Sequence, residues 1–157
     1  MRSEKPVRVL IVDDARAMRA MIHAVLKAVP GIDVVGEAAC ALEAEKAIAA
    51  LDPDVMTSDL EMPQMHGLEF LERLMRRCPM PVVVVSARAA ENSINAVRAL
   101  SLGAVDCIDS MRLFRNESEQ ARLIDTVLAV SNQQPFVRVP RYRAARDTLN
   151  GRHWNFG

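Results

Sequence analysis

The stretch VRVLIVDDARAMR, residues 7–19, decides the fold. Its opening run, VRVLIV, is short, branched and mostly apolar, which is typical of a buried strand. Two aspartates, Asp13 and Asp14, end that run. Apolar residues then recur at the spacing of one helix face: Met18, Ile22, Val25 and Val29. Pro30 and Gly31 stop the helix, so the stretch predicts a strand, an acidic turn and a helix.

The alternation of strand and helix continues along the chain. Further strands are predicted at 32–38, 54–59, 81–85 and 104–108, and further helices at 41–51, 66–78, 92–102 and 116 to about 132. Gly103 is expected to cap the fourth helix, and Asn116 with Glu119 is expected to form a capping box for the fifth. Five strands, each followed by a helix, predict an α/β fold, a doubly wound five-stranded parallel sheet with helices on both faces.

Composition divides the chain into two parts. Half of the 157 residues are hydrophobic and the net charge is zero, so the whole chain is not an electrostatic binder of nucleic acid. Residues 134–157 differ: they hold five arginines and one acid, hence +4, and four of the six aromatic residues. We therefore expect a domain over 1–133 and an arginine- and aromatic-rich tail over 134–157.

The remaining composition predicts a cytoplasmic protein. Cys40, Cys78 and Cys107 form no paired framework and are expected to be buried small hydrophobic residues in a reducing compartment. The N-terminal apolar run is too short for a signal peptide. No run reaches the roughly 18 apolar residues of a membrane helix, so no membrane insertion is expected.

Polar residues follow three of the predicted strands. Asp13 and Asp14 end the first, Asp59 ends the third and Ser86 ends the fourth. If the sheet places these strands together, three carboxylates and a hydroxyl meet at its carboxyl edge, where the sites of such sheets lie. Each aspartate alone could be a strand-end or helix-cap residue. Together they favour a Mg²⁺ site, with Asp59 as a phosphoryl acceptor and Ser86 bonding a phosphate oxygen.

The chain resembles the CheY-like receiver family, the phosphoacceptor module of two-component response regulators, which has a flavodoxin-like fold. The matching stretches are VRVLIVDDARAMR, DVMTSDLEMPQMHGLEFLERL, PVVVVSA and GAVDCI, within residues 6–132. The resemblance implies that Asp59 is the phosphoacceptor, that Asp13, Asp14 and the backbone carbonyl of Glu61 hold Mg²⁺ with it, and that Ser86 is the switch hydroxyl.

Within that family, EMPQMHGLEFL most resembles the receiver of the chemotaxis methylesterase. The 24 residues after position 133 cannot hold an esterase domain and contain no serine-nucleophile motif, so we expect no enzymatic activity.

The fifth strand departs from the family pattern. Where receivers usually have a lysine followed by proline, this chain has Ser110 and Met111, preceded by Asp109, an acid that would oppose a phosphate. Cys107 stands where the family commonly has an aromatic residue. All three lysines precede the third strand, so only Arg88 or Arg112 could substitute. The pattern predicts a retained acidic pocket with a damaged internal readout.

The tail combines guanidinium groups with aromatic rings. Guanidinium forks bind phosphates and the guanine edge, and rings stack on bases. A ligand with two phosphates and two guanines, such as cyclic di-GMP, would engage both. The predicted contacts are Arg138, Arg141, Tyr142, Arg143, Arg146, Asp147, Arg152 and Trp154. This arrangement resembles the CheY-like cyclic di-GMP effectors, receivers with an arginine-rich extension that act on the flagellar motor.

Three functions follow as hypotheses. The favoured one is a module that binds cyclic di-GMP through its tail and docks on the flagellar motor switch or another motility protein. The alternative is a response regulator driven by a histidine kinase through Asp59 in a chemotaxis phosphorelay. A third, less favoured, is a tail that binds a nucleic acid or protein surface directly; a DNA partner is not expected. A basic extension without a ligand also fits the tail's composition.

Overall fold

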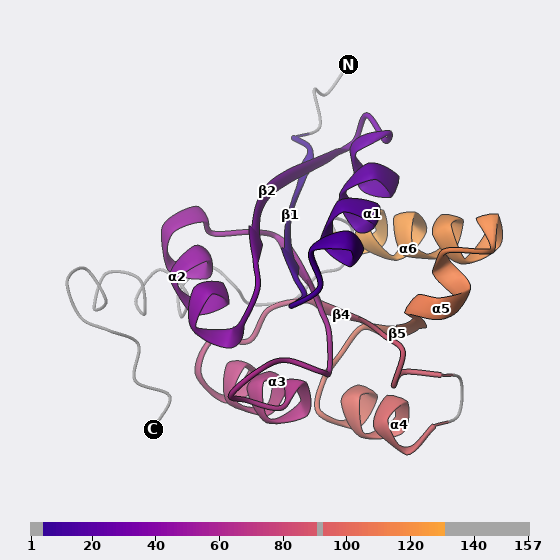
Figure 1. Cartoon of the computed structure of the whole chain (residues 1–157). Helices are drawn as coiled ribbons and strands as arrows, with labels where there is room; N and C mark the ends of the chain where they lie inside the picture. The colour runs from indigo at the N-terminus through magenta and orange to yellow at the C-terminus, as the bar shows by residue number, and fades with distance from the viewer. Residues whose placement is uncertain (1–4, 91–92, 131–157) are drawn as a thin grey trace.

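The structure, a computed structural model, describes residues 5–90 and 93–130. Its strands and helices alternate along the chain (Figure 1). They are β1 (Val7–Val12), α1 (Arg16–Lys27), β2 (Ile32–Ala38), α2 (Ala41–Leu51), β3 (Val55–Ser58), α3 (Gly67–Arg77), β4 (Val82–Ser86), α4 (Ile94–Ser101), β5 (Asp106–Asp109), α5 (Ser110–Leu113) and α6 (Glu117–Val130).

The five strands form one parallel sheet in the order β2-β1-β3-β4-β5. Side chains alternate across it, so that neighbours such as Val9 and Leu10 belong to two different core clusters. Helices α2, α3 and α4 pack on one face, and α1 and α6 pack on the other (Figure 1). The predicted fold, a doubly wound five-stranded parallel sheet, is confirmed.

The strand order positions the site. Because β3 pairs with both β1 and β4, the chain segments that leave these three strands emerge side by side at the carboxyl edge of the sheet. The backbone beyond β3 stays tied to β1, since the amide of Asp59 donates to the carbonyl of Val12 at 3.0 Å. The next residue, Leu60, is only 1% exposed and lies in the core. The segment that follows β3 is therefore anchored on both sides.

The largest difference from the predicted boundaries follows β5. This strand spans Asp106–Asp109 instead of 104–108, because Ala104 still donates to Ala99 and completes the end of α4. The sequence analysis missed the one-turn helix α5, which starts at Ser110. Four residues carry no helical periodicity, so α5 left no signal in the apolar pattern.

The predicted helix ends are mostly found. Gly103 follows α4 with a φ of +112°, as its expected capping role requires. The helix itself begins at Ile94 instead of 92, because the hydroxyl of Ser93 caps it. Asn116 precedes α6, although its side chain accepts from the amide of Ser118, two residues on, instead of from Glu119.

The cysteine and membrane predictions can be compared with the described residues. Cys78 and Cys107 are buried as expected, whereas Cys40 is only half-buried. Within residues 5–90 and 93–130, no helix combines the length and hydropathy that a membrane crossing needs; the longest, α6, has 14 residues.

Candidate functional site

Three carboxylates gather where β1 and β3 end. Asp13, Asp14 and Asp59 each offer an oxygen, and these oxygens lie within 4.8 Å of one another. Asp13 is 3% exposed and Asp59 is 8% exposed, whereas Asp14 faces solvent. The sequence analysis predicted this cluster from two strand ends, and the structure brings its members together.

Local hydrogen bonds hold Asp13 in place. Its carboxylate accepts from the amide of Ala15 at 2.8 Å. Its carbonyl accepts from the guanidinium of Arg19, one turn into α1, at 2.7 Å. Arg19 also lies 3.6 Å from Glu37 in β2, so its guanidinium ties the first acidic turn to the neighbouring strand. The apolar pattern gave no sign of this role for Arg19.

Burial and mutual repulsion make the cluster hard to ionise. Burial, the largest cause, and the neighbouring Asp59 and Asp14 carboxylates raise the pKa of Asp13 to about 7, against the lowering effect of the Ala15 amide and Arg19. Burial also raises the pKa of Asp59, although the Ser86 hydroxyl and two backbone amides oppose that rise. An arrangement that concentrates negative charge in this way is stabilised by a bound cation.

The donor set suits a hard divalent cation. All three groups are carboxylates, two of them are buried, and their oxygens are close enough to share one ion. Mg²⁺ prefers oxygen ligands and keeps several waters, for which the exposed side of Asp14 leaves room. The residues present therefore fit the magnesium site that the sequence predicted. The predicted contribution of the Glu61 carbonyl stays a prediction.

Ser86, Glu61 and Arg88 complete the surroundings of Asp59. The hydroxyl of Ser86 hydrogen-bonds the Asp59 carboxylate and accepts from the amide of Arg88 at 3.2 Å. On the other side, the amide of Glu61 donates to Asp59 Oδ1 at 3.2 Å. The side chains of Glu61 and Arg88 then meet in an ion pair, with Nε and Oε1 2.5 Å apart. This pair links the loops that follow β3 and β4, and the sequence analysis did not predict it.

No lysine or arginine stands at the end of β5 itself, although Arg122 of α6 bonds the carboxylate of Asp106 at the start of the strand. Ser110, at the position of the family lysine, is 4% exposed and begins α5. The carboxylate of Asp109, which the sequence analysis expected to oppose a phosphate, accepts from the amide of Met111 at 2.9 Å and so caps α5. Cys107 lies beneath α4 with its thiol 3.7 Å from the Ala96 carbonyl. Burial, with a smaller contribution from Asp106, raises the pKa of that thiol to about 11.

The two arginines that could replace the lysine lie in different places. Arg88 stands next to the acidic cluster through its bonds to Ser86 and Glu61. Arg112, on α5, lines a cavity of about 140 Å³ between α4, β5 and α6 together with Leu100 and Glu119. None of the clustered aspartates lines that cavity. Arg88 is therefore better placed than Arg112 to substitute for the family lysine.

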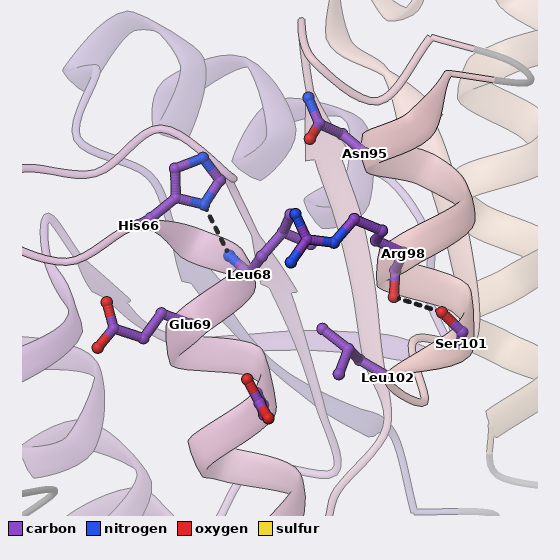
Figure 2. Close-up of a pocket in the computed structure, with 8 residues that line it drawn as sticks. His66, Leu68, Glu69, Asn95, Arg98, Ser101 and Leu102 are labelled. Carbon is purple, nitrogen blue, oxygen red and sulfur yellow. Dashed lines mark hydrogen bonds between the residues drawn. The ribbon is translucent and has the colours of Figure 1, made fainter.

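A second cavity, of about 460 Å³, opens between α3 and α4 (Figure 2). Its rim carries charges of both signs, from Glu69 and Glu72 on α3 and Arg98 on α4. His66, at the start of α3, is turned toward its own helix, where its Nδ1 accepts from the amide of Leu68 at 3.2 Å. This cavity shares no lining residue with the acidic cluster and is a separate feature.

The predicted ligand contacts of the tail lie outside the described residues. These are Arg138, Arg141, Tyr142, Arg143, Arg146, Asp147, Arg152 and Trp154. The cyclic di-GMP site stays a prediction from sequence.

Curated relatives that resemble part of this chain include protein-glutamate methylesterases. The protein-glutamate methylesterase/protein-glutamine glutaminase of Agrobacterium fabrum is 54% identical over 101 residues, which cover 64% of this chain and 29% of that protein. The corresponding enzyme 1 of Caulobacter vibrioides is 52% identical over 102 residues, 65% of this chain and 30% of the relative. The match thus spans less than a third of these enzymes.

Solved structures agree with the sequence relatives. The response regulator domain of Thermotoga maritima CheB superposes with a TM-score of 0.76 at 34% identity, covering 83% of this chain and all of that domain. CheY6 of R. sphaeroides, solved in complex with the P1 domain of CheA3, gives a TM-score of 0.66 at 34% identity, covering 80% of this chain and 99% of the other. The family description "response regulator receiver domain" matches residues 9–110, a span that contains Asp13, Asp14, Asp59 and Ser86. By its fold, its acidic edge and this match, the chain belongs to the response regulator receiver family.

Proposed function

We propose that Asp59 accepts a phosphoryl group from a histidine kinase of a chemotaxis-type two-component pathway. The observation that carries this proposal is the cluster of Asp13, Asp14 and Asp59 oxygens within 4.8 Å, with the Ser86 hydroxyl bonded to Asp59. The methylesterase relatives and the CheY6 complex with a CheA3 domain support the chemotaxis setting. This function is the alternative of the sequence analysis, and the described residues favour it over the cyclic di-GMP reading.

The reaction is a simple displacement. A carboxylate oxygen of Asp59 attacks the phosphorus of a phosphohistidine, the phosphorus–nitrogen bond breaks, and the imidazole leaves with the electron pair and takes up a proton. A divalent cation held by Asp13, Asp14 and Asp59 would offset the negative charge on the phosphoryl oxygens. The hydroxyl of Ser86 is placed to donate to one of those oxygens once Asp59 carries the group.

A small phosphodonor tests the proposal without the kinase. The full chain is incubated with phosphoramidate and Mg²⁺, and intact mass spectrometry measures the phosphoryl adduct. We expect an adduct that disappears in Asp59→Asn and after removal of Mg²⁺ by a chelator. Asp33→Asn, which changes an exposed aspartate on β2, is the matched control and should retain the adduct. An adduct that survives Asp59→Asn would refute the assignment.

We also propose that the tail binds cyclic di-GMP, that the receiver docks on a motility protein, and that the chain has no enzymatic activity. The enzyme relatives match only over the receiver, and we propose a signalling role without esterase chemistry. Calorimetry of the full chain with cyclic di-GMP tests the tail. Binding that is lost in Arg143→Ala/Arg146→Ala would support the predicted clamp, and the absence of heat with the full chain would refute it.

A further inference from the structure

A phosphoryl group on Asp59 increases the negative charge of a site that already holds the Asp13 and Asp14 carboxylates. The group carries between one and two negative charges while the Asp59 carboxylate loses its own, so the site beside Asp13 and Asp14 gains up to about one negative charge. One divalent cation leaves the cluster negative, and no lysine follows Lys46 in the sequence. An arginine near Asp59 would supply further positive charge. This argument rests on the proposed function, since it needs Asp59 to carry the group.

Of two other arginines, one is already bonded within the acidic turn and one lies on another side of the domain. Arg19 bonds the carbonyl of Asp13 at 2.7 Å and pairs with Glu37, so its guanidinium is already in use within the acidic turn. Arg112 lines the cavity on the α4–α6 side. Arg88 differs from both, because its side chain is 63% exposed and pairs with the side chain of Glu61, which can rotate away.

A closed chain of hydrogen bonds connects Arg88 to Asp59. In one direction it runs from the amide of Arg88 through the hydroxyl of Ser86 to the Asp59 carboxylate. In the other it runs from the Arg88 guanidinium to the side chain of Glu61, whose amide returns to Asp59. Ser86 and Glu61, the two residues that Arg88 bonds, thus both bond the carboxylate that would be phosphorylated.

We propose that Arg88 is the cation that binds the phosphoryl group on Asp59, and that Glu61 holds it aside while Asp59 is unmodified. The Arg88–Glu61 pair is exposed on both sides, and such pairs are weak. A guanidinium makes stronger, two-pronged bonds to a phosphoryl group in a partly buried site. Exchange of Glu61 for the phosphoryl group is therefore favourable.

Beryllofluoride with Mg²⁺ is the probe, since it forms a stable acyl-phosphate mimic on an aspartate. Loss of Arg88 alone would be ambiguous, because it also leaves the Glu61 charge unpaired. The decisive comparison is made without that charge, between Glu61→Gln and Glu61→Gln/Arg88→Ala. If Arg88 binds the group directly, the double variant binds beryllofluoride about tenfold more weakly than the single variant. Fluorine NMR of the bound species gives both affinities.

Two further variants and a metal titration sharpen the result. Arg88→Lys restores a cation and should bind within a few-fold of the wild type. Arg112→Ala, an exposed arginine on the other side, should change the affinity by less than twofold. Mg²⁺ titration without beryllofluoride should give equal affinities for Glu61→Gln and Glu61→Gln/Arg88→Ala, which shows that the metal site is intact. Far-UV circular dichroism confirms that each variant is folded.

The outcomes separate the role of Arg88 from the proposed phosphorylation of Asp59. Equal beryllofluoride affinities for Glu61→Gln and Glu61→Gln/Arg88→Ala overturn the role of Arg88. If binding still requires Asp59 in that case, the proposed function stands. Beryllofluoride binding that persists both in Asp59→Asn and in the wild type without Mg²⁺ overturns the proposed function and the role of Arg88 with it.

Discussion

Replacement of Gly67 by alanine should disturb both the fold and the site. Gly67 begins α3, and its amide donates to the carbonyl of Leu60 at 2.9 Å. A methyl group at Gly67 would lie 2.4 Å from the carbonyl oxygen of Asp59 and 2.4 Å from the Cα of Leu60. Carbon atoms in contact prefer about 3.5–4.0 Å, so α3 and the loop would have to separate by about 1 Å.

Displacement of the loop that Gly67 approaches costs free energy. The atoms in question are backbone, the Asp59 amide is bonded to Val12, and the Leu60 side chain is buried. Overpacking of this kind costs about 1–3 kcal/mol, and we expect about 3 kcal/mol because no flexible side chain can absorb the strain. That is a large fraction of the 5–15 kcal/mol that typically stabilises a domain of this size.

Urea unfolding measures the cost, and Gly31→Ala is the matched control. A methyl group there meets only the end of the Leu128 side chain, at 3.3 Å, so we expect a change of less than about 0.5 kcal/mol. Mg²⁺ affinity of the folded Gly67→Ala variant should also fall, since Asp59 must move with the loop. If both glycine variants unfold at the same urea concentration, the close approach of α3 to the phosphoacceptor loop is not a source of stability.

Three further predictions concern single buried or capping groups. Within the described chain, the hydroxyl of Thr57 is buried without a hydrogen-bond partner, so Thr57→Val should stabilise the fold by about 1 kcal/mol in urea unfolding. Burial raises the pKa of Glu45 from 4.5 to about 7, against the pull of Arg73 and Arg77. The folded state then holds the proton more tightly, so wild-type stability falls as the pH rises from about 4.5 to about 7. Glu45→Gln should be more stable by about 2–3 kcal/mol above pH 7 and not below pH 4.5, by unfolding at several pH values. Ser93→Ala removes the cap of α4 and should cost about 1 kcal/mol, measurable by thermal unfolding.

The sheet and the acidic cluster were predictable because both follow from periodicity. Branched apolar runs mark the strands, and the residue after each run arrives at the same edge, so Asp13 and Asp59 could be placed at one edge of the sheet. That their strands are neighbours is known only from the observed strand order. The pairing of Glu61 with Arg88 joins residues 27 positions apart in two irregular loops, where no period constrains direction. The close approach of Gly67 likewise depends on loop geometry that the sequence pattern does not encode.

The structure bears on the prediction that loss of the β5 lysine damages the internal readout of the acidic pocket. That prediction rested on the missing lysine and the altered aromatic position, with Arg88 or Arg112 as the residues that could substitute. Arg88 bonds Ser86 and Glu61 beside Asp59, and its carbonyl accepts from the hydroxyl of Ser93 at 3.2 Å. The same hydroxyl caps α4. If Arg88 leaves Glu61 for a phosphoryl group, the N-terminus of α4 is one hydrogen bond away, by a route that does not involve the aromatic position occupied by Cys107. The tail and the pocket then become independent inputs to be tested separately.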